Sequence, residues 1–136
     1  MIFDTCVWVA LASGHVEPKA IIVAAGDEPI CTSVISLGEL AFGVEACVDP
    51  AERAVRAAYL RHVETRPNLE VSQKTAAAFG VLAASVEQTG RSHRARWNDL
   101  WIAAQAIEHG NTLLTPNARD FAGLPGLRVA TLAPTI

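Results

Sequence analysis

The sequence predicts an α/β fold in which a mainly parallel sheet is covered by helices on both faces. Short apolar segments alternate with longer segments of helical periodicity along the chain. A chain of 136 residues with 51% hydrophobic side chains can form one core. No repeat, low-complexity tract or long linker rich in Gly, Ser or Pro interrupts it. We therefore expect a single domain over residues 1–136.

The expected elements follow from local pattern, in chain order. Short apolar runs predict strands at residues 1–3, 29–32, 69–71, 112–114 and 127–132. Longer periodic runs predict helices at residues 7–11, 18–25, 34–47, 50–66, 73–89 and 98–109. Gly90 and Gly110 follow the last two helices, where a left-handed residue often ends a helix, and Asn98 is expected to cap the last one. Strands separated by helices imply crossovers, and sites in such sheets form beyond the carboxyl ends of the strands.

Composition and charge restrict the class of protein. The formal net charge is −3, so the chain has no overall basic field, and any nucleic-acid contact must be local. The three cysteines, Cys6, Cys31 and Cys47, form no close pairs, which argues against a disulfide scaffold or a zinc site and favours a reducing cytoplasm. The start has no basic n-region, and no apolar run approaches the ~18 residues of a membrane span. We expect a soluble, unprocessed, cytoplasmic protein.

Three acids stand where this architecture places chemistry. Asp4 directly follows the first predicted strand, although an Asp there can also cap the helix that comes next. Helical spacing places Glu39 on an apolar or small-residue face, where a buried carboxylate must be paired, protonated or bound to metal; the alternative is a solvated Glu at the edge of that face. Asp99 opens the helix over residues 98–109 on its inward face, and ordinary complementation of the helix dipole is the alternative.

Together these acids predict a metal site. Asp4, Glu39 and Asp99 would repel one another unless a cation joined them. Oxygen-only ligation suits Mg²⁺ or Mn²⁺, which keep several waters and take few protein ligands. Zinc would require Cys or His, and the histidines show no ligand spacing.

The best local candidate for nucleic-acid contact is a basic segment just before Asp99. Arg91, Arg94 and Arg96 lie within six residues, and such a cluster can neutralise phosphates; the alternative is a solvated loop between helices. Trp97 follows the cluster and is expected, with Trp101 on the same helix face, to be a core or interface anchor rather than a base-stacking platform.

Four ordered motifs carry a resemblance to a known family. They are MIFDTCV at residues 1–7, SLGELAFGV at 36–44, NDLWIAAQA at 98–106 and LLTPNARDF at 113–121. The chain resembles the PIN-domain family over almost its whole length and is most similar to the VapC toxins. The resemblance implies a three-layer α/β/α sandwich, Mg²⁺- or Mn²⁺-dependent endoribonuclease activity as the toxin of a type II toxin–antitoxin pair, homodimerisation, and neutralisation by a VapB-like antitoxin. It also implies products with a 5′-phosphate and a 3′-hydroxyl.

The resemblance assigns the residues of the site. Asp4, Glu39 and Asp99 match the three core acids of the family. Asn117 stands at a fourth catalytic position that is often Asp, which implies that one metal ligand is weakened or shared. The remaining supporting positions are Thr5 and Thr115, which match family hydroxyls; Cys6, where many relatives have Ser or Asn; and Asp120, a possible further acid that more often has a structural role.

Other functional classes stay open at this point. A receiver-like signalling domain also places acids at strand ends around Mg²⁺, but it would need a phosphoacceptor Asp after the third strand, where Ser72 and Gln73 stand. A pure interaction module would use the acids as caps, and stabilisation by metal would distinguish it. Among nucleases, a housekeeping RNA-processing enzyme is the closest alternative to a toxin.

Overall fold

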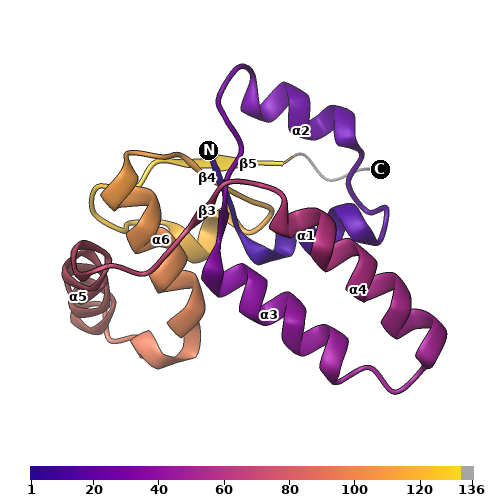
Figure 1. Cartoon of the computed structure of the whole chain (residues 1–136). Coiled ribbons are helices and arrows are strands. Elements are labelled where there is room, and N and C mark those ends of the chain that lie inside the picture. The colour runs from indigo at the N-terminus through magenta and orange to yellow at the C-terminus, as the bar shows by residue number, and fades with distance from the viewer. Residues whose placement is uncertain (133–136) are drawn as a thin grey trace.

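The computed structural model describes residues 1–132 and has the predicted alternation of strands and helices (Figure 1). The strands are β1 (Ile2–Phe3), β2 (Thr32–Ser33), β3 (Asn68–Leu69), β4 (Leu113–Thr115) and β5 (Val129–Thr131). The α-helices are α1 (Thr5–Ala12), α2 (Pro18–Ala25), α3 (Val34–Glu45), α4 (Pro50–Glu64), α5 (Gln73–Gln88) and α6 (Trp97–His109). Two 3-10 turns, η1 (His93–Arg96) and η2 (Ala118–Phe121), complete the described elements.

All the strand pairs of residues 1–132 are parallel. β4 lies between β1 and β5, with Leu113 opposite both Ile2 and Val129. β2 pairs with β3, and a single parallel bridge between Ile2 and Cys31 joins this pair to β1. The strand order is therefore β3-β2-β1-β4-β5. Since the strands run in one direction, the segments that follow β1, β2 and β4 emerge at the same edge.

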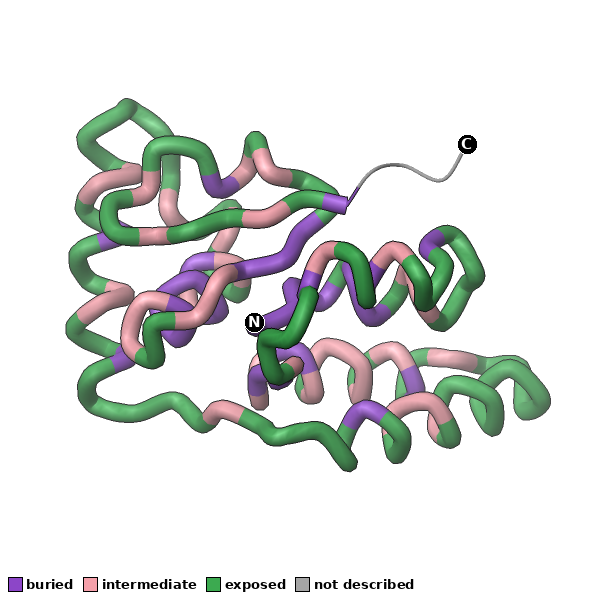
Figure 2. The backbone as a smooth tube through the Cα atoms, turned by 90° about the horizontal axis from the view of Figure 1, so that it is seen from above, coloured by how far each residue is buried: buried purple, intermediate pink, exposed green. Residues whose placement is uncertain are grey.

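Each face of the sheet carries its own apolar core. Ile2 is buried with Leu82 of α5 and Ile102 of α6. Its neighbour Phe3 is buried in the other core, where its ring lies 4.8 Å from that of Trp8. Successive side chains of a strand point to opposite faces, so β1 is covered on both sides. Figure 2 shows buried segments, in purple, towards the middle of the molecule and exposed segments, in green, around them; β1, β2 and β4 are buried, whereas β3 and β5 are only partly so. The predicted layering is confirmed.

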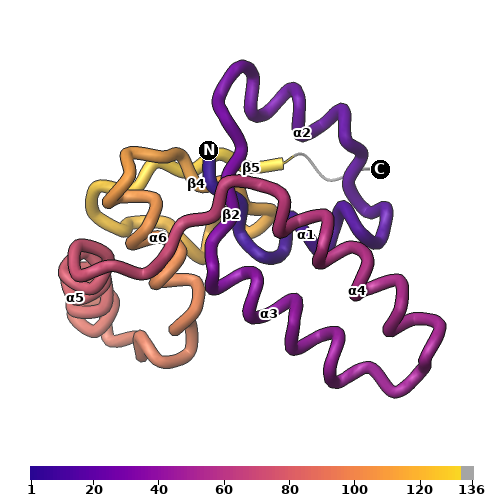
Figure 3. The backbone as a smooth tube through the Cα atoms, in the orientation of Figure 1, coloured from indigo at the N-terminus to yellow at the C-terminus, as the bar shows by residue number. Residues whose placement is uncertain are grey.

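The helix α3 has a special place in this arrangement. Figure 3 shows α3 and α4 side by side as a helical hairpin that extends away from the sheet. Ser33 caps α3 by accepting a hydrogen bond from the Ile35 N–H at 3.0 Å. The start of α3 consequently lies at the sheet edge, while its far end projects outward. None of the helices within residues 1–132 has the length and apolar character needed to cross a membrane.

The element boundaries differ from the prediction in two informative ways. β2 begins at Thr32, later than predicted, although residues 29–31 still run beside β1: the Met1 ammonium donates to the Pro29 carbonyl at 2.7 Å, and the Cys31 N–H donates to the Met1 carbonyl at 2.9 Å. The predicted cap at Asn98 is wrong. The turn η1 runs directly into α6, so that Arg96 occupies the N-cap position without a capping side-chain bond. Gly110 ends α6 in the left-handed region, at φ +65°, as predicted.

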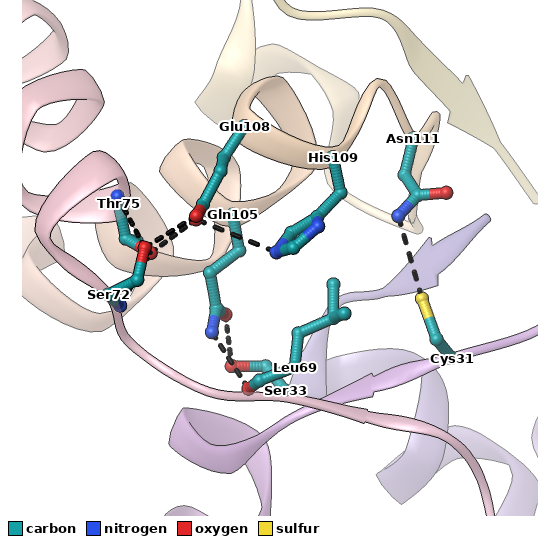
Figure 4. A network of polar contacts seen from close by, with 9 residues as sticks. All are labelled: Cys31, Ser33, Leu69, Ser72, Thr75, Gln105, Glu108, His109 and Asn111. Carbon is teal, nitrogen blue, oxygen red and sulfur yellow. Dashed lines mark hydrogen bonds and ion pairs between the residues drawn. The ribbon is translucent and has the colours of Figure 1, made fainter.

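A buried polar network ties α6 to distant parts of the fold (Figure 4). Gln105 is fully buried, and its Nε2 donates to the Leu69 carbonyl at 2.9 Å while its Oε1 accepts from the Ser33 hydroxyl. One side chain thus connects α6 to both β2 and β3. At the next turn Glu108 accepts hydrogen bonds from the hydroxyls that begin α5, those of Ser72 and Thr75.

Candidate active site

Asp4 lies buried at the carboxyl end of β1, 3% exposed. Its Oδ2 accepts a hydrogen bond from Thr115 Oγ1 at 2.9 Å, and its Oδ1 is buried with no hydrogen-bond partner among residues 1–132. Burial raises the pKa of Asp4 above its ordinary value, and the Thr115 hydrogen bond offsets only part of the rise. Asp4 occupies the N-cap position of α1 but makes no capping side-chain bond. Its position therefore leaves one oxygen free for another partner.

Glu39 enters the same region from α3. Its Oε1 accepts a hydrogen bond from Thr5 Oγ1 at 2.7 Å, and Thr5 Oγ1 lies 2.9 Å from Ser36 Oγ. The Thr5 proton is directed to the carboxylate, so Ser36 must donate to Thr5. This relay holds Glu39 in one orientation. Sequence reasoning named Thr5 but gave no role to Ser36, although Ser36 stands three residues before Glu39 on the same helix face.

Asp99 completes the group from the first turn of α6. Burial, followed by the charges of Asp4 and Glu39, raises the pKa of Asp99 to about 6, and the charge of Arg96 opposes this. The neighbouring Cys6 thiol has its pKa raised to about 11 by burial and by the same acids. The acids thus act on one another electrostatically.

These side chains share an open pocket of about 880 Å³. Asp4, Glu39 and Asp99 stand on its wall, together with Thr5 and Cys6. The pocket continues between α1, α3 and α4 past apolar side chains that include Val9, Leu40, Val55 and Tyr59. The structure therefore brings the three predicted acids from three different elements to one cavity.

Asn117 and Asp120, the predicted site residues that follow β4, have different surroundings. Asn117 is exposed just after β4, and its backbone N–H donates to Thr115 Oγ1 at 3.1 Å. Asp120 accepts a hydrogen bond from Arg96 Nη2 at 2.7 Å, so its carboxylate already has a cationic partner. This contact supports a structural role for Asp120.

The predicted basic segment divides into two parts. Arg91 and Arg94 are exposed and make no ion pair within residues 1–132. Arg96 differs from them, because it is half-buried and held by Asp120 beside the acids. Arg96 therefore already has an ion-pair partner across the fold, and a role of the three arginines in RNA contact stays a prediction.

The tryptophans after this segment pack on one ring. Phe79 of α5 stacks on Trp101 at 4.1 Å and meets Trp97 edge-on at 5.0 Å. These contacts join α5 to the start of α6, as expected of packing anchors.

The donor set fits a hydrated hard cation. Within residues 1–132, no group of three or more Asp, Glu, His or Cys side chains is placed so that it could hold a metal ion. The available donors are nevertheless carboxylate oxygens, and the free Asp4 Oδ1 points to a missing positive partner. Mg²⁺ commonly uses one or two carboxylates and keeps several waters. The three-carboxylate site predicted from sequence is thus brought together without being closed into a cage.

Comparison with known proteins places this geometry in context. The sequence model of the PIN domain matches residues 1–127. Ribonuclease VapC5 from Mycobacterium tuberculosis is 35% identical over 125 residues, covering 92% of this chain and 87% of that protein. Ribonuclease VapC4 from the same organism is 30% identical over 129 residues, covering 95% of this chain and 94% of the relative.

A solved structure shares the fold over almost its full length. The crystal structure of VapBC2 from Rickettsia felis, bound to a DNA fragment from their promoter, contains a chain with a TM-score of 0.79 and 26% identity. The match covers 98% of this chain and 100% of that one.

Proposed function

The chain belongs to the PIN-domain family, and on that premise we propose that it is an endoribonuclease, the toxin of a toxin–antitoxin pair. The observation that carries the proposal is the meeting of Asp4, Glu39 and Asp99 at one pocket, with one buried Asp4 oxygen left without a partner. The names of the relatives support it, since they are ribonucleases, and the solved neighbour is a VapBC complex. We further propose a VapB-like antitoxin as partner and a homodimer as the assembled form.

The chemistry assigned to the site begins with a divalent cation, for which we propose Mg²⁺ or Mn²⁺ held by Asp4, Glu39 and Asp99. Such an ion supplies an activated water and neutralises charge on the phosphate. The protein contributes orientation: Thr115 holds the Asp4 carboxylate, and Thr5 holds that of Glu39. In the metal-free protein the pKa of Asp99 is raised to about 6, and a bound cation would favour its charged form.

Removing the metal tests this proposal directly. We expect purified protein to cleave RNA with Mg²⁺ or Mn²⁺ and to lose cleavage in excess EDTA, because the carboxylates alone provide no cation to offset phosphate charge. Cleavage is followed on gels with end-labelled RNA, and added Mn²⁺ should restore it. Full activity in excess EDTA would contradict the metal mechanism while leaving the family assignment in place.

The exposed arginines give a second test. Replacing Arg91 and Arg94 together by Ala should weaken RNA binding and reduce its salt dependence, since each lost phosphate contact lowers the slope by about 0.7 for single-stranded RNA. Arg61→Ala with Arg66→Ala is the matched control, because both residues are exposed, Arg61 in the last turn of α4 and Arg66 just after the helix. The measurement is RNA binding in EDTA over a range of salt concentrations. An unchanged slope would mean that the segment is a solvated loop.

A further inference from the structure

We propose that a second, smaller pocket beside the acids binds the base of a nucleotide next to the cleaved bond and so sets a sequence preference. This inference rests on the proposed function. The pocket has a volume of about 490 Å³ and is formed by the first turns of α3 and the start of α6. Its lining residues are Val34, Ile35, Gly38, Glu39, Phe42 and Asn98.

The apolar walls suit the flat face of a base. Val34 and Ile35 are half-buried. Phe42 is 73% exposed and packs in neither apolar core. Base stacking on an exposed aromatic ring is common in single-stranded RNA recognition, and Phe42 is available for it. Stacking accepts any base, so these walls account for binding but not for preference.

Asn98 supplies the polar group that can read a base edge. It lies exposed in the first turn of α6, and its side chain forms no hydrogen bond within the part of the chain that the structure describes. Because η1 takes over the start of the helix, Asn98 is also free of the capping role. An amide presents both donors and an acceptor, which matches the paired groups on a base edge.

The pocket is continuous with the acids. Glu39 lines both cavities, and its carboxylate is held by Thr5 from the side of the larger one. A base in the smaller pocket would therefore place its own phosphates next to the acids. Arg91 and Arg94 are exposed in the segment that precedes α6 and are available to contact phosphates of the same RNA.

Gly38 makes the proposal testable without damage to the fold. It lies inside α3, where glycine is less favourable than alanine, and a Cβ at this position would meet no atom within 4 Å. Neither helix formation nor packing requires glycine here, and the open space is the pocket. Gly80 of α5 also has open space but lines neither pocket, which makes it a matched control.

The experiment compares Gly38→Leu, Asn98→Ala and Gly80→Leu on a pool of short RNAs of random sequence, with cut sites mapped by sequencing. We expect Gly38→Leu to lower kcat/KM on the preferred RNA by about tenfold or more, the usual scale for one stacked base. Asn98→Ala should flatten the preference at the same single position. Gly80→Leu should behave as wild type, and no variant should have a lower melting temperature.

An RNA with an abasic nucleotide at that position separates base binding from other effects. Wild type and Gly38→Leu should cleave and bind it equally, since no base is left to enter the pocket. The proposal would be overturned if Gly38→Leu lowered kcat/KM equally on intact and on abasic RNA. It would also be overturned if Gly38→Leu and Asn98→Ala both kept the sequence preference of wild type. The proposal would also be overturned if light scattering showed that Gly38→Leu differs from wild type in oligomeric state. The pocket would then be an interface between two copies of the chain. Wild type that cleaves no RNA would instead contradict the proposed function itself.

Discussion

Replacing Asp4 by Asn is expected to abolish RNA cleavage while leaving the fold intact. The Asn side chain keeps the shape of Asp4 and can still accept the Thr115 hydrogen bond, so only the charge is lost. A metal ion contributes several kcal/mol to stabilising the transition state, and about 1.4 kcal/mol corresponds to a factor of ten. We therefore expect kcat/KM to fall by at least about a hundredfold. Cleavage assays and a thermal melt measure the two effects separately.

The matched control for Asp4 is Asp27→Asn, since Asp27 is exposed and lines neither pocket. Expression in a bacterial host adds a cellular measurement: wild type should slow growth, and Asp4→Asn should not. If Asp4→Asn cleaves RNA and slows growth as wild type does, Asp4 serves only the structure.

The second large effect is expected on the stability of the metal-free protein when Asp99 is replaced by Asn. In the metal-free protein, Asp99→Asn should raise the free energy of unfolding at neutral pH by about 1 to 2 kcal/mol, even though cleavage is lost. The pKa rises from 3.8 to about 6 on folding, mainly through burial and then through Asp4 and Glu39. About 1.4 kcal/mol corresponds to each pKa unit, and the partial exposure of Asp99 reduces the total.

The pH dependence has a definite sign. A raised folded-state pKa means that the folded protein binds the proton more tightly than the unfolded chain. The wild-type protein therefore loses stability as pH climbs from 3.8 towards 6, and the whole loss is present above the folded pKa. The advantage of Asp99→Asn should accordingly be largest above pH 6 and vanish below pH 3.8.

Thermal melts in EDTA at the two ends of this range test the stability effect, with Asp27→Asn as the control. Added Mg²⁺ should reduce the difference in stability between Asp99→Asn and wild type. A ligand that binds the folded form stabilises it, and wild type, which keeps the Asp99 carboxylate, should bind the ion more tightly. An Asn variant less stable than wild type at neutral pH would show that the Asp99 carboxylate makes a structural contact.

Most element positions were predictable because their causes are local. Apolar runs and helical periodicity depend on neighbouring residues, and α2 spans the predicted residues 18–25. Gly110 ended α6 as predicted for the same reason. The start of α6 was not predictable in this way, since the 3-10 turn before it replaced the side-chain cap that Asn98 was expected to provide.

The sequence by itself determined the layered α/β architecture, the order of its elements and the acids that stand at a strand end and on inward helix faces. Only the tertiary structure decided how those acids are used: that Asp4 keeps one buried oxygen without a partner, that Thr5 orients Glu39, and that Asp120 captures Arg96. The reason is physical. Strand and helix patterns arise between near neighbours, whereas burial, ion pairing and raised carboxylate pKa values arise between groups far apart in the chain that folding brings into one low-dielectric region.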